Sequence, residues 1–142
     1  MTDGTDAKAV DRLRQALAKE GAKLKLIAPK IGKMANGLVP DQTVEGAPSV
    51  LFDAVVLLPS EAGAKDLTAM AAAVNWVRDA FGHLKAIGFN EAAASLLDKA
   101  GIAPDDKLGV IFFEAGRGLE SFIATAKKHK VWDREKLVHP PR

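Results

Sequence analysis

The residues of this sequence that could do chemistry lie in loops that follow predicted strands. Residues 85–97 read KAIGFNEAAASLL, so a short apolar strand leads directly into a helix that begins near Asn90. In several classes of α/β enzyme, a strand-to-helix turn of this kind holds the nucleophile. Here the turn offers Gly88, Phe89 and Asn90, and none of these residues is a nucleophile. The sequence therefore keeps the turn but not the reactive group.

Ser60 and Glu61, in the loop PSEAGAKD, are the next candidates. A serine nucleophile needs a general base within hydrogen-bond reach, and the sequence places no histidine in a neighbouring loop. A capping role at the start of a helix is the simpler interpretation of Ser60. Because ligands of open α/β sheets gather at the carboxyl ends of the strands, both residues remain candidates for ligand binding.

A glycine-rich loop, EAGRGLE, follows the last predicted strand. Gly116, Arg117 and Gly118 precede a helix there, and a helix start can hold an anion. The spacing matches neither the dinucleotide-binding GxGxxG motif nor a P-loop, so a plain turn is the alternative. The candidate small-ligand or anion site of this chain thus comprises Ser60, Glu61, Gly88, Arg117 and Gly118.

The three histidines do not form a metal site by their spacing. His83, His129 and His139 are not arranged as ligands on one helix face, so we expect no metal. His83 precedes a strand, which is the wrong end of a sheet for chemistry. Trp76 and Trp132 are interpreted as packing residues.

The charged clusters also have structural explanations. Residues 127–130 read KKHK at the end of a predicted helix, where cations interact favourably with the helix dipole. Lys30 and Lys33 are expected in a solvated loop. Asp53 stands at the start of an apolar strand, where it would cap backbone groups or pair with a lysine.

The periodicity of apolar residues predicts an alternation of helices and strands. Helical spacing predicts helices within residues 2–22, 65–82, 90–101 and 119–132, with Gly21 and Gly101 as terminating residues. Apolar runs predict strands within 22–29, 49–59, 83–89 and 107–113. Asn36-Gly37 predicts a small hairpin.

This alternation predicts one α/β domain over residues 1–142, a flavodoxin-like three-layer sandwich with a mostly parallel sheet. The pattern begins with a helix, so the first strand of that fold is missing. Because this strand normally lies between the second and the third, residues 22–29 and 49–59 lose a shared neighbour. We expect these two strands either to pair directly or to associate with a partner chain that covers the gap.

Composition excludes several classes of function. Lys and Arg number 20 against 18 Asp and Glu, so electrostatics give no case for nucleic acid or an anionic membrane. The sequence has no cysteine, which excludes disulfides and thiolate sites. No apolar run approaches the roughly 20 residues that span a bilayer, and the polar start MTDGTDAKAV is not a signal peptide. A cytoplasmic protein is therefore expected.

Three segments carry a resemblance to a known family. EGAPSVLFDAVVLLP, DAFGHLKAIG and KKHKVWDREK occur in an order that resembles the C-terminal domain of large-subunit haem catalases. The resemblance covers almost the whole chain. It places the domain in the class I glutamine amidotransferase-like superfamily, beside PfpI-type proteases and deglycase-like proteins.

The resemblance implies that the enzyme machinery of this superfamily is absent. Its enzymes place a cysteine at the elbow, where this sequence has Gly88, and often a Gly-Gly after the preceding proline, where Pro59 is followed by Ser60 and Glu61. They place a histidine after the next strand, where this sequence offers Glu114. We therefore expect no catalytic residue, and we interpret Gly88 as tolerating a strained backbone.

The resemblance also implies what the whole protein would do. Catalases decompose hydrogen peroxide on a haem whose iron is held by a tyrosine, and this sequence has no tyrosine. The chain would then be a non-catalytic accessory domain without a cofactor of its own, packing on or stabilising the haem-containing catalase core of a homo-oligomer. The alternatives are a domain that binds a small ligand or anion at the strand ends, and a chaperone-like interaction module.

Overall fold

Parallel strands alternate with helices along residues 1–114, 117–128 and 131, which are the residues that the computed structural model describes. The helices are α1 (Ala7–Lys19), α2 (Glu61–Thr68), α3 (Ala71–Gly82), α4 (Ala94–Lys99) and α5 (Leu119–Ala126), with short 3-10 helices η1 (Ser49–Leu51), η2 (Glu91–Ala93) and η3 (Asp106–Leu108). The strands are β1 (Ile27–Ala28), β2 (Gln42–Thr43), β3 (Ala54–Leu57), β4 (Ala86–Phe89) and β5 (Val110–Phe112). Within the described part of the chain, no helix is long and apolar enough to cross a membrane.

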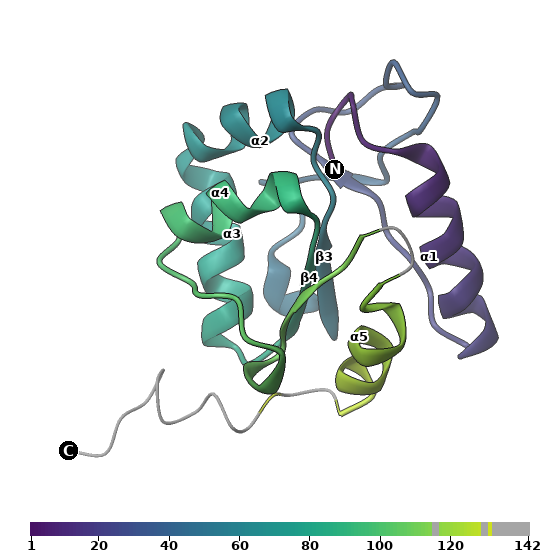
Figure 1. Cartoon of the computed structure of the whole chain (residues 1–142). Coiled ribbons are helices and arrows are strands. Elements are labelled where there is room, and N and C mark those ends of the chain that lie inside the picture. Colours follow the sequence, from purple (N-terminus) through teal and green to yellow (C-terminus); the bar gives the residue numbers. More distant parts are fainter. Residues whose placement is uncertain (115–116, 129–130, 132–142) are drawn as a thin grey trace.

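The strands form two parallel sheets, which confirms the predicted α/β class. One sheet has the order β3-β4-β5, with Val56 opposite Gly88 and Gly88 opposite Ile111. The other pairs β1 with β2. Figure 1 shows α2, α3 and α4 on one side of β3 and β4, and α1 and α5 on the other. The arrangement is the predicted three-layer sandwich.

Successive side chains of β3 point alternately into apolar clusters on the two faces of the sheet. Val55 and Leu57 belong to the core built with α2, α3 and α4. Ala54 and Val56 instead pack toward α5, where Phe122 is buried. Because successive side chains of a strand point to opposite faces, a continuous apolar run covers both layers, as expected for a buried parallel strand.

Direct pairing of the strands within 22–29 and 49–59, one of the two expected outcomes, is wrong; association with a partner chain stays a prediction. β1 and β3 belong to different sheets, and the described residues contain no strand between them. Between them lies a groove of about 720 Å³, lined largely by apolar side chains of β3 and of helices on both faces. We call this the inner groove.

The first five residues join the two sheets at one end of the inner groove. The Met1 amino group donates a hydrogen bond to the Ile27 carbonyl in β1 at 2.8 Å. The Thr5 hydroxyl donates to the carbonyl of Leu58, directly after β3. Thr5 also accepts a hydrogen bond from the backbone N–H of Thr2 at 2.8 Å. Hydrogen bonds from this segment therefore reach both sheets.

The predicted helix ends are confirmed. Asp6 caps α1 by accepting a hydrogen bond from the Lys8 N–H at 2.9 Å. Gly21 and Gly101 follow their helices with φ of 72° and 77°, which is the left-handed conformation that glycine adopts most easily.

Three predicted elements are shorter or divided. The helix predicted within 65–82 breaks at Met70, whose extended backbone lets α3 start in a new direction while its side chain packs on the core. The run 49–59 opens with η1 and becomes a strand only at Ala54. Asn36-Gly37 makes a turn, closed by a hydrogen bond from the Met34 N–H to the Leu38 carbonyl at 2.8 Å, but the strands before and after it, β1 and β2, pair in parallel and do not form a hairpin.

A first prediction concerns Gly118, which has a φ of 79° and lies where an added Cβ would overlap the Phe112 carbonyl oxygen. We expect Gly118→Ala to destabilise the fold by at least about 2–3 kcal/mol, because backbone strain and the overlap add. Gly101→Ala, at a similar φ in open space, should cost only about 1–2 kcal/mol, the cost of a left-handed backbone for a residue with a Cβ. Gly82→Ala, in open space at an ordinary φ, should be neutral or stabilising. Urea unfolding gives the free energy of unfolding of the three variants. Equal losses of stability in Gly118→Ala and Gly101→Ala would contradict the prediction.

A second prediction concerns pH. Burial lowers the pKa of the Met1 amino group from 8.0 to about 6. Because the unfolded chain binds this proton more tightly, stability should be complete above pH 8 and fall as the pH drops toward 6, by up to about 2–3 kcal/mol. N-terminal acetylation removes the charge at every pH and leaves one N–H for Ile27. Unfolding free energies of the free and acetylated chains should diverge between pH 8 and 6; parallel curves would show that the amino group is solvated in the folded state.

Candidate functional site

The carboxyl ends of β3, β4 and β5 form the edge where the candidate residues were predicted to lie. β3 leads through Pro59 into α2, and β4 leads through Asn90 into η2 and α4. β5 is followed by a turn that leads into α5. The predicted strand-to-helix turns are therefore present at this edge.

Ser60 is the N-cap of α2. Its hydroxyl accepts a hydrogen bond from the Gly63 N–H at 3.0 Å, and its own N–H donates to the Thr2 hydroxyl at 2.9 Å. The two hydroxyls of Ser60 and Thr2 lie 3.2 Å apart. Glu61 follows as an exposed residue in the first turn of α2, where a carboxylate interacts favourably with the helix dipole. These contacts position the helix, and among the described residues no imidazole accompanies the Ser60 hydroxyl.

Gly88 lies inside β4 and not in the turn itself. It is buried, and its φ is not among the positive values found in the described chain. The interpretation that Gly88 is present because it tolerates a strained backbone is therefore wrong. A Cβ at this position would lie 3.2 Å from Cδ2 of Phe122 in α5, so the glycine lets the helix approach the sheet closely.

Asn90 makes the turn, a role that sequence reasoning did not assign. Its side-chain N–H donates to the Pro59 carbonyl at 3.0 Å, and its side-chain oxygen accepts from the Ala93 N–H at 3.0 Å. Its backbone N–H donates to the Leu57 carbonyl at 3.1 Å. One side chain thus caps a helix and ties the end of β4 to the end of β3; a capping-type residue directly after an apolar strand is the signal that marks it.

Arg117 and Gly118 lie on the other side of the edge. Arg117 is exposed, and its backbone exchanges hydrogen bonds with Glu114 at 2.9 and 3.2 Å. Gly118 is the N-cap of α5 and has no side chain to offer. Glu114 accepts a long hydrogen bond, 3.4 Å, from the N–H of Glu91 at the start of η2. Gly116 lies outside the described residues.

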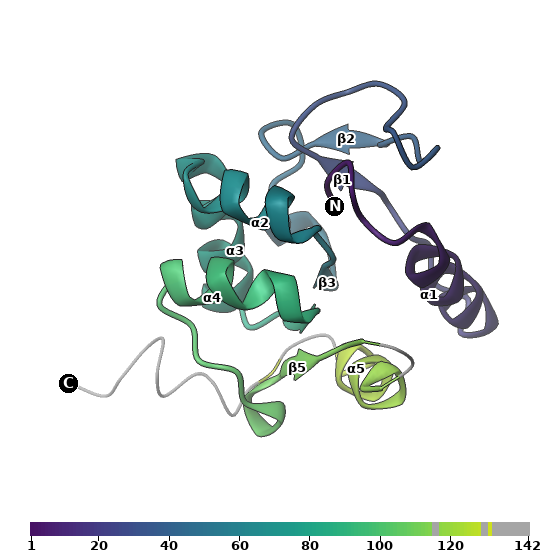
Figure 2. The same cartoon turned by 45° about the horizontal axis from the view of Figure 1, so that its top comes forward.

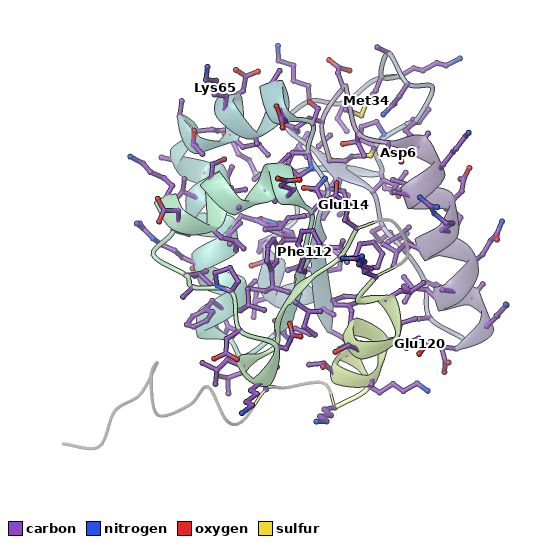
Figure 3. The ribbon with its side chains drawn as sticks, in the orientation of Figure 1. Asp6, Met34, Lys65, Phe112, Glu114 and Glu120 are labelled. Atoms are coloured by element: carbon purple, nitrogen blue, oxygen red, sulfur yellow. The ribbon has the colours of Figure 1, made fainter. Side chains whose placement is uncertain are left out.

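A cavity of about 320 Å³ opens at the same edge, between α1 and the strand ends. Its polar lining comes from Asp6, Arg12, Asn90 and Glu114. Figure 3 places Asp6 at the start of α1 and Glu114 at the end of β5. Arg12 and Asp6 approach within 4.0 Å on the exposed surface, where such a pair contributes little. The five residues predicted to bind a ligand do not line this cavity, and their role stays a prediction.

The remaining polar candidates lie away from this edge or outside the described residues. His83 ends α3 and is exposed, and Asp53 is exposed directly before β3. The Trp76 indole N–H donates to the Ala47 carbonyl at 2.7 Å while the ring packs on the core. Among residues 1–114, 117–128 and 131, no three His, Asp or Glu side chains are grouped as metal ligands. His129, Trp132 and His139 lie outside this part.

The strand ends thus provide helix caps and turn contacts. Hydroxyl, amide and carboxylate groups of Ser60, Asn90 and Glu114 each accept a hydrogen bond from a helix start. This arrangement stabilises strand-to-helix connections. A nucleophile activated by an adjacent base is not found among the described residues.

Comparison with solved structures bears on the fold. DJ-1beta of Drosophila melanogaster superimposes with a TM-score of 0.65 over 97% of this chain and 91% of that one, at 16% sequence identity. At this identity the similarity establishes the flavodoxin-like fold and nothing about activity.

Comparison with sequences bears on the family. A family described as the C-terminal domain found in long catalases matches residues 1–136. Catalase C of Rhizobium meliloti is 42% identical over 141 residues, which are 96% of this chain and 20% of that protein. Catalase HPII of Pseudomonas aeruginosa is 33% identical over 95% of this chain and 20% of its own length. The chain spans about a fifth of the length of these relatives. It belongs to the family of C-terminal domains found in long catalases, as the resemblance of its three segments implied.

Proposed function

We propose that this chain is a non-catalytic accessory domain of a hydrogen-peroxide-decomposing haem catalase, and that it packs on the catalase core and stabilises it. The family match over residues 1–136 carries this proposal. The capping contacts at the strand ends support it, because they use the positions where an enzyme of this fold would hold its reactive groups.

Among the residues that the structure describes, the polar groups do not support a haem site. The tyrosine that ligates haem in catalases is absent from all 142 residues. His83, the histidine within the described residues, is exposed at the end of α3. The polar cavity at the strand ends is lined by carboxylates, an arginine and an amide, and none of these is a usual haem ligand. We therefore place haem in the remainder of the catalase, and we expect a cytoplasmic homo-oligomer.

The first test of this proposal uses the purified chain. It should show no Soret absorbance after expression with added haem precursor, and no oxygen release from hydrogen peroxide. Catalase C of Rhizobium meliloti, treated identically, is the positive control. A stoichiometric Soret band together with peroxide turnover would contradict the proposal.

The stabilising role needs a second measurement. A form of Catalase C truncated ahead of its matched C-terminal segment should lose activity faster on heating than the complete protein. Adding an excess of this chain should slow that loss and should give co-elution in size exclusion. Serum albumin at equal mass controls for non-specific protection, and protection no greater than albumin's would overturn the stabilising role.

A further prediction concerns the elbow. In Gly88→Cys the thiol would be buried against Phe122, and burial in apolar surroundings raises a thiol pKa. We expect an alkylation pKa above about 8.5 and no turnover of ester or glyoxal-type substrates. Glu91→Cys, at an exposed position in the same turn, should alkylate with an ordinary pKa. A depressed pKa at position 88 accompanied by turnover would show that the elbow retains catalytic surroundings.

A further inference from the structure

The loop between β1 and β2 contains a dipeptide, Asn36-Gly37, that is chemically unstable. The backbone nitrogen of the glycine can attack the side-chain carbonyl carbon of the asparagine, because no Cβ hinders its approach. A C–N bond forms, the side-chain nitrogen leaves as ammonia, and water then opens the cyclic imide to aspartate or isoaspartate. The other two asparagines, Asn75 and Asn90, precede tryptophan and glutamate. Asn36 is therefore the asparagine at which this reaction is least hindered.

In the folded chain, hydrogen bonds hold the reacting groups of this dipeptide. The Gly37 N–H, which must lose its proton to attack, donates to the Met34 carbonyl at 2.9 Å. The Asn36 side-chain oxygen accepts from the Leu38 N–H at 3.1 Å, as in an Asx-turn. The side-chain N–H of Asn36 donates to the Thr5 carbonyl at 2.8 Å. Removal of the Gly37 proton and departure of the side-chain nitrogen both require that such bonds open.

The bond from Asn36 to Thr5 links the loop to the segment that leads into α1. A second bond between the same two segments joins the Ala35 N–H to the Asp3 carboxylate at 3.3 Å. Figure 2 shows the loop between β1 and β2 beside the start of the chain. The Thr5 hydroxyl in turn donates to the Leu58 carbonyl, directly after β3. Opening of the Asn36 contact is therefore coupled to detachment of residues 2–5 from the end of β3.

The products of the reaction cannot restore this contact. Aspartate has acceptor oxygens and no donor, so at position 36 its carboxylate would face the Thr5 carbonyl without a proton between them. The Asp3 carboxylate, bound to the adjacent Ala35 N–H, would add like-charge repulsion. Isoaspartate also lengthens the backbone by one carbon, which shifts Leu38 relative to Met34. Both products should release the loop from the start of α1.

We propose that Asn36 is a site of spontaneous deamidation, that attachment of residues 2–5 to the end of β3 slows the reaction, and that the product releases the loop of residues 29–41. Water is the only co-reactant. Lys30 and Lys33 are exposed in this loop, so its release creates a site for proteolysis. The state of Asn36 thus records how long the segment before α1 has been detached. This assignment is independent of the accessory role in a catalase.

The first test compares the rate of deamidation in the folded chain with that in a synthetic peptide of residues 33–40. Both are incubated in mildly alkaline buffer, and peptide mapping by mass spectrometry, with enzymatic labelling of isoaspartate, measures the products. We expect the folded chain to react at least about tenfold more slowly than the peptide, because reaction needs local opening. Asn75 and Asn90 are internal controls and should stay intact. Equal rates in the chain and the peptide would overturn control by the fold.

A second test examines the attachment of residues 2–5. Thr5→Val removes the hydroxyl that holds Leu58 but keeps the carbonyl that Asn36 contacts, and it should raise the rate at least about tenfold. Thr68→Val, which removes an exposed hydroxyl contact within α2, should leave the rate unchanged. Val77→Ala, buried in α3, destabilises the whole fold and should accelerate the reaction less for an equal loss of unfolding free energy.

Two results of this comparison would overturn the proposal. Equal acceleration by Thr5→Val and Val77→Ala at equal loss of unfolding free energy would assign control to global unfolding. Absence of product in both the unchanged chain and Thr5→Val would show that Asn36 is not a modification site.

A third test examines the released loop. Asn36→Asp reproduces one product, and trypsin should cut it after Lys30 and Lys33 at least about fivefold faster than the unchanged chain. Asn36→Ala loses the side-chain hydrogen bonds without adding a charge and should accelerate cleavage less. Asn75→Asp, on the exposed surface of α3, controls for the added charge and should leave cleavage unchanged. Cleavage of Asn36→Asp at the rate of the unchanged chain would overturn the proposed release.

Discussion

Backbone hydrogen bonding at the inner edge of a parallel sheet is the constraint on which this structure depends. β3 is apolar on both faces and covered by helices, as is typical of a central strand of a parallel sheet. The first five residues supply hydrogen bonds at one end of that edge only, through Met1 and Thr5. A buried peptide group without a partner costs on the order of 1–3 kcal/mol, so the stability of this edge depends on how its peptide groups are satisfied.

At the strand ends, the polar groups of the turns form hydrogen bonds with the backbone. Ser60 and Asn90 both satisfy N–H groups at helix starts. Asn90 also ties the two strands together through Pro59 and Leu57. Gly88, which has no side chain, allows Phe122 to pack directly on β4. In this family member the turn is retained because it connects strand and helix, whatever chemistry related proteins perform there.

Local signals in the sequence were sufficient for most of the elements. Asp6, Gly21 and Gly101 mark helix ends by side-chain capping and left-handed backbone, and both effects act within a few residues. The break at Met70 was missed because its cause is tertiary: the continuous apolar pattern of 65–82 hides a change of direction that packing of α2 and α3 requires. The Asn36-Gly37 signal predicts a turn correctly, but the strands before and after it, β1 and β2, run parallel, so they do not form a hairpin.

The candidate site was harder to predict because its arrangement also depends on tertiary contacts. The sequence identifies Ser60 and Gly118 as residues of loops, but not which loops share a cavity. Asp6 and Glu114 are far apart in the chain, yet both line one cavity between α1 and the strand ends. Direct pairing of β1 with β3, one of the two expected outcomes, is not found: the two strands belong to different sheets and line opposite sides of the inner groove.

Native-state hydrogen exchange of the free chain tests this account most directly. The N–H groups of Val55 and Leu57 face β4, whereas the N–H of Val56 between them faces the inner groove. In the monomer, the amides of Val55 and Leu57 should exchange only through large-scale opening, and the Val56 amide should exchange orders of magnitude faster by local access of water. Equal protection of all three amides in a strict monomer would show that the edge of β3 is already paired, and the account of an open inner groove would be wrong.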